Sequence, residues 1–168
     1  MKENHPNLSV DSTDLFLLKL VQDDGQIPNA KVAEKLAMSE TPCWRRRKRL
    51  EEKGLIVGYQ ANLNRELLGF EVLALVQICF SNHTDDLPFQ FEKKIQEIPE
   101  ILSCHNVTGE ADYFLLVVAE NLTSYEKFLR NTLRKLPGVN SIKSSLSLRE
   151  VKSSSRLPIN VLLNGSSE

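Results

Sequence analysis

Apolar residues spaced at helical intervals predict the first two helices of the chain. The first begins at Asp11 or Ser12, both plausible N-caps, places positions 17, 18 and 21 on one face, and ends near 24–25. The second runs over 30–37 behind Asn29. Alanines on its inward side allow another helix to cross closely, as a helix-turn-helix requires.

A third helix follows after a short turn over residues 38–40. Ser39 and Thr41 are both possible N-caps, and the pattern does not choose between them. Pro42 fits the first turn, where its missing N–H has no intrahelical partner, and Gly54 is a natural C-terminal stop. The first third of the chain is therefore predicted to be a three-helix unit.

The period of the pattern changes beyond the third helix. Residues 55–61 are β-prone but interrupted by glycine, which predicts a small wing or a strand that leaves the domain. Residues 62–69 form a hinge-like linker. Apolar and other residues then alternate strictly over 70–80, which predicts a strand with one fully apolar face.

The rest of the chain alternates between helix and strand periodicity. Helices are predicted over 88–97 and 125–136, and further strands over 101–107, 113–119 and 139–151. The order β-α-β, β-α-β predicts a ferredoxin-like half-barrel with both helices on one side of the sheet.

The opposite face of that sheet needs a partner. Leu73 and Leu75 lie on one side of the first strand and Val72, Ala74 and Val76 on the other, so neither side is polar. We expect the open face to pack against a second copy in an isologous dimer, which presents two copies of the N-terminal helical unit related by a two-fold axis.

Composition places the chain among ordinary globular proteins. It has 168 residues, of which 41% are hydrophobic and 26% charged. Neither a membrane-spanning apolar run nor a signal peptide is expected. The three cysteines, Cys43, Cys79 and Cys104, form neither a disulfide framework nor a CxxC metal motif and suit a reducing cytoplasm. Residues 156–168 are expected to be a C-terminal tail, without fixed structure from Asn164 onward.

Charge is concentrated in one place although the net charge is only −1. Residues 45–49 are five consecutive cations, and the segment 41–53 contains six basic and two acidic residues, a net charge of +4. A solvated helix face is the ordinary interpretation of such a run. The preceding short helix and tight turn favour a recognition helix in the DNA major groove instead.

The position of each residue on this helix predicts its role. Trp44 either packs structurally or lies against DNA, and Pro42 belongs to the same surface. Phosphate contacts position a protein on DNA, whereas contacts to base edges specify sequence. We expect the residues early in the helix to face base edges (Ser39, Thr41, Trp44, Arg45) and the later cations to reach phosphates (Arg46, Lys48, Arg49).

Two groups of motifs match a known family. The first contains Val10-Asp11, Asp14, Leu17-Leu18, Asp24-Gly25, Ala33-Glu34, Leu36, Ser39, Thr41-Pro42-Cys43-Trp44-Arg45-Arg46, Leu50-Glu51, Gly54-Leu55-Ile56 and Gly58-Tyr59. The second contains Val107, Gly109, Asp112-Tyr113, Leu136-Pro137-Gly138-Val139 and Glu150-Val151-Lys152. This pattern resembles the leucine-responsive/asparagine-responsive (Lrp/AsnC, feast/famine) regulators.

The resemblance implies an α+β protein with two domains. An N-terminal winged helix-turn-helix domain would span 1–61, with the helix-turn-helix at 29–48. A linker at 62–69 would precede a ferredoxin-like βαββαβ effector domain (RAM/ACT-like) at 70–155. Arg47 departs from the pattern, because this inward position is usually aliphatic in the family. We expect its head group to extend to water or to phosphate.

The resemblance also implies a site for a small effector, usually an amino acid, between subunits near the turn that joins the second and third strands. Turn amides around a glycine can hold a carboxylate, and an aspartate can accept from an ammonium group. Alternatively, Gly109 serves only the turn geometry and Asp112 only caps it. The residues carried over are Thr108, Gly109 and Asp112, with Leu122, Ser145, Leu146 and Ser147 as weaker matches.

Catalysis is not expected. His5, His83 and His105 show no metal or triad spacing, and Cys104 and His105 are neighbours on a strand whose side chains face opposite ways. The sequence predicts a cytoplasmic, nucleoid-associated transcriptional regulator with no cofactor. Its expected partners are double-stranded DNA, an amino-acid effector and copies of itself (a dimer, with higher forms such as an octamer), but no membrane. The alternatives are a weakly specific architectural DNA-binding protein and a C-terminal domain that only oligomerises.

Overall fold

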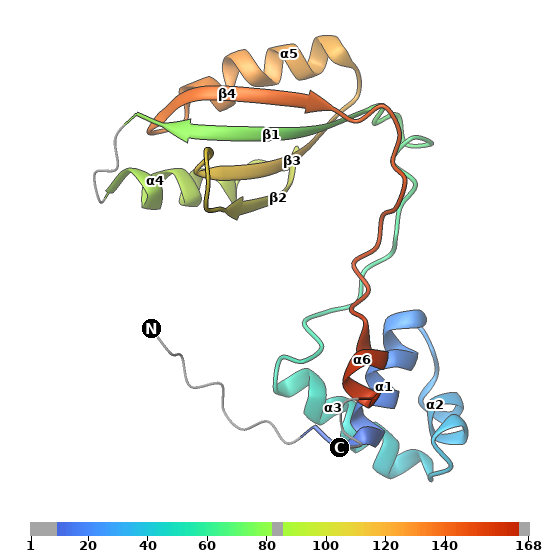
Figure 1. Ribbon diagram of the computed structural model, residues 1–168. Coiled ribbons are helices and arrows are strands. Elements are labelled where there is room, and N and C mark those ends of the chain that lie inside the picture. The colour runs from blue at the N-terminus through green and yellow to red at the C-terminus, as the bar shows by residue number, and fades with distance from the viewer. Residues whose placement is uncertain (1–9, 82–85, 165–168) are drawn as a thin grey trace. The chain divides into compact units, whose positions relative to one another are not determined.

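The computed structural model describes residues 10–81 and 86–164, and the chain divides into two compact units. The first unit combines the chain up to Asn62 with the segment from Ser153 onward, and the second spans Leu63–Lys152 (Figure 1). The two ends of the chain therefore belong to the same unit.

Three helices form the centre of the first unit. They are α1 (Ser12–Asp23), α2 (Asn29–Lys35) and α3 (Glu40–Glu52). Asp11 is the N-cap of α1 and forms a reciprocal capping box with Asp14. The apolar faces predicted from the sequence meet in one core (Leu17, Val21, Ile27, Val32, Ala33, Cys43, Leu50).

The turn between α2 and α3 is tighter than the sequence suggests. The predicted helix over 30–37 ends at Lys35, because Ala37 adopts a left-handed conformation with φ 50°. The Met38 N–H donates to the Ala33 carbonyl at 3.0 Å, which closes the C-terminus of α2 as in a Schellman motif. Ser39 is the N-cap of α3, although its side chain makes no capping hydrogen bond.

No strand forms over residues 55–61, contrary to our expectation of a β-wing or exit strand. Val57 is 96% exposed, so the apolar residues of this stretch do not share a buried face. A strand needs a neighbour for its backbone hydrogen bonds, and within the described part of the chain none runs beside this segment.

The predicted C-terminal tail contains a short helix, α6 (Ile159–Asn164), which lies against α1. Ile159 is buried. The Gln22 side chain accepts from the Leu157 N–H at 2.8 Å and donates to the Leu157 carbonyl at 2.9 Å. Its four apolar residues, Ile159, Val161, Leu162 and Leu163, are too few to give a periodic signal, so the sequence analysis missed this helix. Residues 165–168 lie outside the described part of the chain.

The second unit has the predicted ferredoxin-like βαββαβ order. Its antiparallel sheet has the strand order β2-β3-β1-β4. No helix in the described part of the chain is long and apolar enough to cross a membrane. The elements are β1 (Val72–Phe80), α4 (Asp86–Ile95), β2 (Ile101–Asn106), β3 (Tyr113–Ala119), α5 (Leu122–Asn131), the 3-10 helix η1 (Leu133–Lys135) and β4 (Val139–Leu146).

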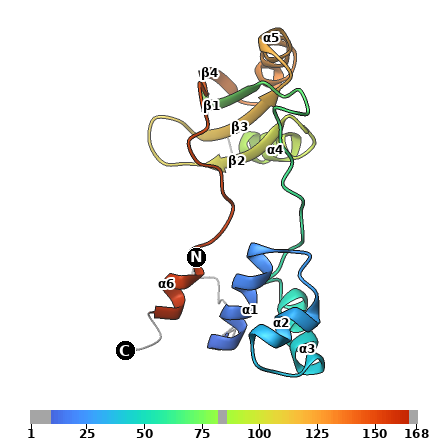
Figure 2. The ribbon, with the colours of Figure 1, turned by 90° about the vertical axis from the view of Figure 1, so that its right-hand side faces the viewer.

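The two faces of the sheet differ in what covers them. Alternate residues of β1 and β3, such as Val76 and Leu115, pack with Phe91 of α4 and Phe128 of α5 in one core. Both helices lie on the same side of the sheet (Figure 2). The other face carries Leu73, Leu75, Phe114, Leu116 and Val118, of which Leu73 and Val118 are buried, and neither α4 nor α5 packs on this face. Leu75 is 50% exposed there.

The fourth strand is shorter than the predicted range of 139–151. Its last backbone contact runs from the Ser147 N–H to the Leu73 carbonyl at 2.8 Å. Because β1 begins at Val72, residues 148–151 have no strand to pair with, and they are exposed.

Candidate DNA-binding and effector sites

The two sides of α3 have different environments. Cys43 and Leu50 are buried in the core of the first unit. The residues predicted to face DNA lie on the exposed side, beginning at the N-terminus of the helix (Ser39, Thr41, Pro42, Trp44, Arg45, Lys48). Arg45 has no hydrogen bond or ion pair within the described part of the chain, so its guanidinium group is available to a ligand.

Trp44 does not pack in the core. Its side chain is 47% exposed, and the Lys48 ammonium lies 5.2 Å from the centre of its ring. Asn29, Trp44, Arg47, Lys48 and Glu51 line a shallow depression of about 310 Å³ beside this pair. Of the two interpretations of Trp44, this position is compatible with contact to DNA.

Two of the three cations predicted to contact DNA phosphates instead bind carboxylates within the protein. The Arg46 guanidinium donates to Asp14 at 2.8 Å and to Asp11 at 2.6 Å, and Arg49 donates to Asp14 at 2.5 Å. Asp14 is fully buried. Lys48 instead has an exposed side chain with only a long, 3.8 Å contact to Glu52.

These ion pairs shift the ionisation of their members. The Asp11 and Asp14 carboxylates raise the pKa of Arg46 through hydrogen bonds and charge, against the opposing effect of burial. Burial favours a higher pKa for Asp11, but the hydrogen bonds from Arg46 and from the Asp14 N–H, with the charges of Arg46 and Arg49, lower it overall. The contacts therefore favour the charged forms.

The expectation that Arg47 extends to water or phosphate is wrong. Its side chain is only 15% exposed. The guanidinium donates to the Ile27 carbonyl at 3.0 Å, to the Gly25 carbonyl at 3.3 Å and to the Tyr59 hydroxyl at 2.9 Å. It stays inside because the turn between α1 and α2 offers it acceptors. A Cβ atom on Gly25 would approach the Tyr59 ring to 3.2 Å, so glycine allows this close packing.

The predicted effector turn joins β2 to β3 and is anchored to β1. The Asp112 side chain accepts from the Phe80 N–H at 2.7 Å, and the Asp112 N–H donates to the Ile78 carbonyl at 2.9 Å. Gly109 has φ +123°, a conformation that L side chains rarely adopt. Turn geometry alone therefore accounts for both residues, and Thr108 and Gly109 are exposed.

The seven predicted effector residues fall into two groups at opposite ends of the sheet. The turn at 108–112 lies beside the end of β1, where Ile78 pairs with Tyr113. Ser145, Leu146 and Ser147 lie beside the start of β1, and Leu122 follows β3 at that same end. Three to five residues of β1 separate Ile78 from the partners of Ser145, Leu146 and Ser147, which is about 10–17 Å. One small molecule cannot contact both groups of the same chain.

Comparison with known proteins matches both units. Residues 10–57 match the model of a winged helix-turn-helix DNA-binding domain, and residues 73–157 match that of the Lrp/AsnC ligand binding domain. The chain belongs to the Lrp/AsnC family. It is thus a DNA-binding transcriptional regulator with a ligand-binding domain, as the sequence resemblance predicted.

Individual relatives span nearly the whole chain. The Bkd operon transcriptional regulator of Pseudomonas aeruginosa is 39% identical over 89% of this chain and 98% of its own length. The leucine-responsive regulatory protein of Escherichia coli is 37% identical over 94% of this chain and 96% of its own. A solved transcriptional regulator from Neisseria meningitidis, in complex with L-methionine, matches with a TM-score of 0.86, 32% identity and coverage of 92% and 99%.

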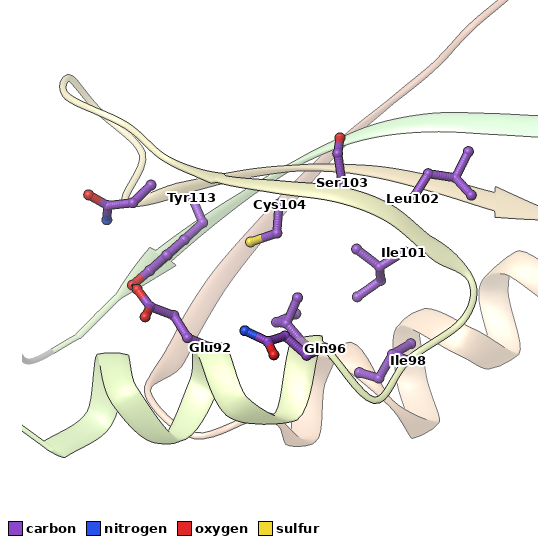
Figure 3. A pocket seen from close by; sticks show the side chains of 10 residues that line it. Glu92, Gln96, Ile98, Ile101, Leu102, Ser103, Cys104 and Tyr113 are labelled. Atoms are coloured by element: carbon purple, nitrogen blue, oxygen red, sulfur yellow. The ribbon is translucent and has the colours of Figure 1, made fainter. Parts of the chain in front are cut away.

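A separate pocket of about 360 Å³ lies in this Lrp/AsnC regulator between α4 and the edge strand β2 (Figure 3). The Tyr113 hydroxyl donates to Glu92 at 2.8 Å, and the Cys104 sulfur points toward α4. Burial, and then Glu92, raises the pKa of Cys104 to about 11 and that of Tyr113 to about 12. Both groups are therefore neutral at neutral pH. None of the predicted effector residues lines this pocket.

Of the three histidines, the structure describes only His105, which follows Cys104 on β2. Cys104 packs against the core while His105 is exposed, so the two neighbours face opposite ways as expected. His5 and His83 lie outside the described residues. No group of three His, Cys, Asp or Glu side chains within the described ranges is arranged to hold a metal ion.

Sequence reasoning missed the side chains that hold the arginines of α3. They are Asp14 on α1 and the pair Glu51 and Tyr59, in which the Tyr59 hydroxyl donates to Glu51 at 2.6 Å. The spacing of Asp11 and Asp14 was a usable signal, since two acidic residues three apart at a helix start indicate a capping box. Glu51 and Tyr59 both belong to the family motif, but their spacing did not indicate that they contact Arg47, because these contacts form only in the folded chain.

Proposed function

We propose that this Lrp/AsnC regulator reads a specific DNA sequence through α3 and adjusts its DNA binding, or its oligomeric state, to an amino acid. The observation that carries the proposal is the exposed face of α3. It presents hydroxyl, aromatic and cationic side chains behind a tight turn, while the other face is fixed in the core.

Each exposed side chain suits a particular kind of DNA contact. Ser39 and Thr41 offer hydroxyls near the start of α3, and Arg45 offers a planar fork that fits the major-groove edge of guanine. Trp44 and Pro42 add apolar surface. Lys48 is a point charge suited to a phosphate. We assign base contacts to Thr41, Trp44 and Arg45, and backbone contacts to Lys48.

An amino acid is the effector best supported. The Neisseria meningitidis relative was solved with L-methionine, and the Escherichia coli relative is named for its response to leucine. In this chain the turn over 108–112 offers exposed backbone amides around Gly109 for a carboxylate. Asp112 already anchors the turn, so we assign it the shaping of the site as well as contact with an ammonium group.

Formation of the site requires a second subunit. Four residues of β1, about 13 Å, and the width of the sheet separate Tyr113 next to the Gly109 turn from Leu146 in one chain, so we infer that the two groups meet across an interface between copies. The apolar open face of the sheet, with Leu75 and Phe114, supports a dimer, and larger assemblies such as an octamer are compatible with further contacts.

The proposed setting follows from these partners. We place the regulator in the cytoplasm, associated with the nucleoid, where DNA and free amino acids are both present. It acts by binding rather than by catalysis and uses no cofactor. Its ligand domain controls where and how tightly it holds DNA.

A thermal-shift screen against the twenty amino acids, with light scattering on each hit, tests the effector half of the proposal. Binding to the native state raises the melting temperature, by an amount that grows with ligand concentration. We expect stabilisation by one or a few amino acids, together with a change in particle size. If no amino acid shifts the melting temperature, the second unit is an oligomerisation module and the effector proposal fails.

Salt titration separates specific regulation from an architectural role. Non-specific binding is almost entirely electrostatic and weakens steeply with salt. We expect an operator selected by the protein itself to be bound about a thousandfold more tightly than random DNA. Equal affinities at every salt concentration would favour the architectural protein.

A further inference from the structure

The arginines of α3 form two separate contact groups inside the first unit. Asp14 accepts from Arg46 through one oxygen and from Arg49 through the other. Arg47 donates to the carbonyls of Gly25 and Ile27 on the far side of the helix. Three of the five consecutive cations are thus bound by the protein itself.

Asp14 cannot readily release its partners. Its carboxylate is fully buried, and a buried charge is tolerated only when it is paired and hydrogen-bonded. If Arg46 and Arg49 both turned to DNA phosphates, Asp14 would keep only the Asp11 N–H, at 3.2 Å. The phosphates would have to compensate for that loss as well as for their own desolvation.

Arg47 is held even more completely. Besides the two carbonyls, it donates to the Asn29 side chain at 3.1 Å and to the Tyr59 hydroxyl at 2.9 Å, and its guanidinium lies 4.9 Å from the centre of the Tyr59 ring. These contacts fix α3 against the turn between α1 and α2. Moving Arg47 to DNA would break all of them.

We propose that the cationic run of α3 is divided by function, and that Arg46, Arg47 and Arg49 are positioning residues rather than DNA contacts. Arg46 and Arg49 fix α3 to α1, and Arg47 fixes it to the α1–α2 turn. Together they set the depth and angle at which α3 enters the groove. Arg45 and Lys48 carry the DNA contacts of this run. The inference rests on the proposed DNA reading by α3.

The salt dependence of DNA binding counts phosphate contacts and so tests the division. Binding of each full-length variant to a short duplex of random sequence is measured by fluorescence anisotropy over a series of sodium chloride concentrations. Each lost phosphate contact lowers the slope of log affinity against log salt by about 1. Arg45→Gln removes a base contact, so it should lower the affinity for the operator relative to random DNA. Lys48→Gln should lower the slope by about that amount per bound subunit. Arg46→Gln, Arg47→Gln and Arg49→Gln should not.

Two comparisons control this experiment. Lys127→Gln removes an exposed cation of α5 in the other unit and corrects for the change in net charge. Arg46→Lys keeps the charge that a phosphate needs. It replaces the guanidinium nitrogen that donates to both Asp11 and Asp14 with an ammonium on a shorter side chain. It therefore tests the proposal even if Arg46→Gln does not fold.

A second readout distinguishes positioning from general stability. The duplex that the wild-type protein enriches from a random pool serves as operator, and its affinity is compared with that of random DNA well below the melting temperature. Arg46→Lys should lower this ratio by roughly tenfold, as the loss of one base-pair contact does, with an unchanged slope. An unchanged ratio would contradict positioning.

The outcomes separate this inference from the proposed function. If Arg46→Gln or Arg49→Gln lowers the slope as much as Lys48→Gln, the arginines contact phosphates and the division is wrong, although DNA reading by α3 stands. If the wild-type protein enriches no sequence and Arg45→Gln changes nothing, α3 does not read DNA and both proposals fail.

Discussion

Asp14 of α1 fixes the position of α3 through its ion pairs with two arginines. Among the described residues it is the one charged side chain that is fully buried, and two arginines of α3 donate to it. Removing one partner of a buried ion pair typically costs about 3–5 kcal/mol, because the other charge is left unpaired. Part of Arg46 and Arg49 is exposed, so the cost here falls toward the lower end of that range.

The positive φ of Gly109 determines how much stability a substitution there costs. Gly109→Ala should destabilise the protein by about 1–3 kcal/mol, because φ is +123° there and an added Cβ atom meets nothing within 4 Å that could compensate. We expect DNA binding to persist and the response to the amino acid to weaken. Thermal unfolding and an amino-acid titration measure the two effects.

Gly54→Ala is the matched control for Gly109→Ala. Gly54 also has a positive φ, of +72°, and open space around it, but it lies in the first unit. It should lose similar stability and keep the effector response. Equal responses in both variants would move the effector site away from the turn over 108–112.

The raised pKa of Tyr113 predicts that the stability of the second unit falls at alkaline pH. Burial, and then its bond to Glu92, raises the pKa of Tyr113 from an ordinary value of 10 to about 12 in the folded chain. The folded state therefore holds its proton more tightly, and this contribution to stability is complete below pH 10 and is lost as pH rises toward 12.

Tyr113→Phe tests that dependence through chemical unfolding at several pH values. The variant should lose about 1 kcal/mol at neutral pH, the usual contribution of one hydrogen bond. Its stability should then decline less than that of the wild-type protein between pH 10 and 12. The same decline in both proteins would mean that another group titrates.

Helices and strands differ in how far sequence alone could predict them. Long periodic segments were predicted well: Tyr113–Ala119 is the third strand of the effector unit as expected, and α1 begins at the predicted cap Asp11. The ends of elements were less certain. β4 ends at Leu146 because β1 offers no further partner, a limit visible only once the strands are paired.

The missed features share a physical cause, which is contact between distant parts of the chain. α6 is too short to show periodicity and depends on Gln22 and α1 for its position. Arg47 looked misplaced on an inward face because its acceptors, such as the Gly25 carbonyl, lie about twenty positions earlier in the chain. The positions of Arg46 and Arg49 beside Asp14 were hidden for the same reason.

The docking of α6 predicts a stability contribution from the C-terminal segment. Ile159→Ala should lower the free energy of unfolding by about 1–2 kcal/mol, below the usual core value, because so short a helix can adjust. Ile159 is 9% exposed, whereas Val161 on the same helix is 66% exposed, so Val161→Ala should change stability by less than about 0.5 kcal/mol. Equal losses in the two variants, measured by denaturant unfolding, would mean that α6 does not dock through Ile159.

At the scale of the whole molecule, the open face of the sheet leads to assembly. Leu75 and Phe114 are 50% and 38% exposed there, and apolar side chains exposed together favour burial by a partner. A dimer formed on this face would account for the proposed effector site, to which each chain would contribute one group of residues.

Leu75→Asp tests this dimer directly. A carboxylate at the centre of an apolar interface loses its hydration without gaining a partner, so the variant should be monomeric at concentrations where the wild-type protein is a dimer. Phe89→Asp, on the surface of α4, is the control, because Phe89 is 71% exposed but lies on the helix side. Size-exclusion chromatography with light scattering distinguishes the two. A Leu75→Asp variant that remained dimeric would place the interface elsewhere.

The most direct test of the whole account is a binding titration on the operator that the wild-type protein selects from random DNA, with and without the amino acid that stabilises it. We predict that the operator is bound about a thousandfold more tightly than random DNA. The amino acid should shift this affinity or the number of subunits bound, and Arg45→Ala should weaken binding without changing the oligomer. Equal affinity for operator and random DNA, unaffected by any amino acid, would contradict the account.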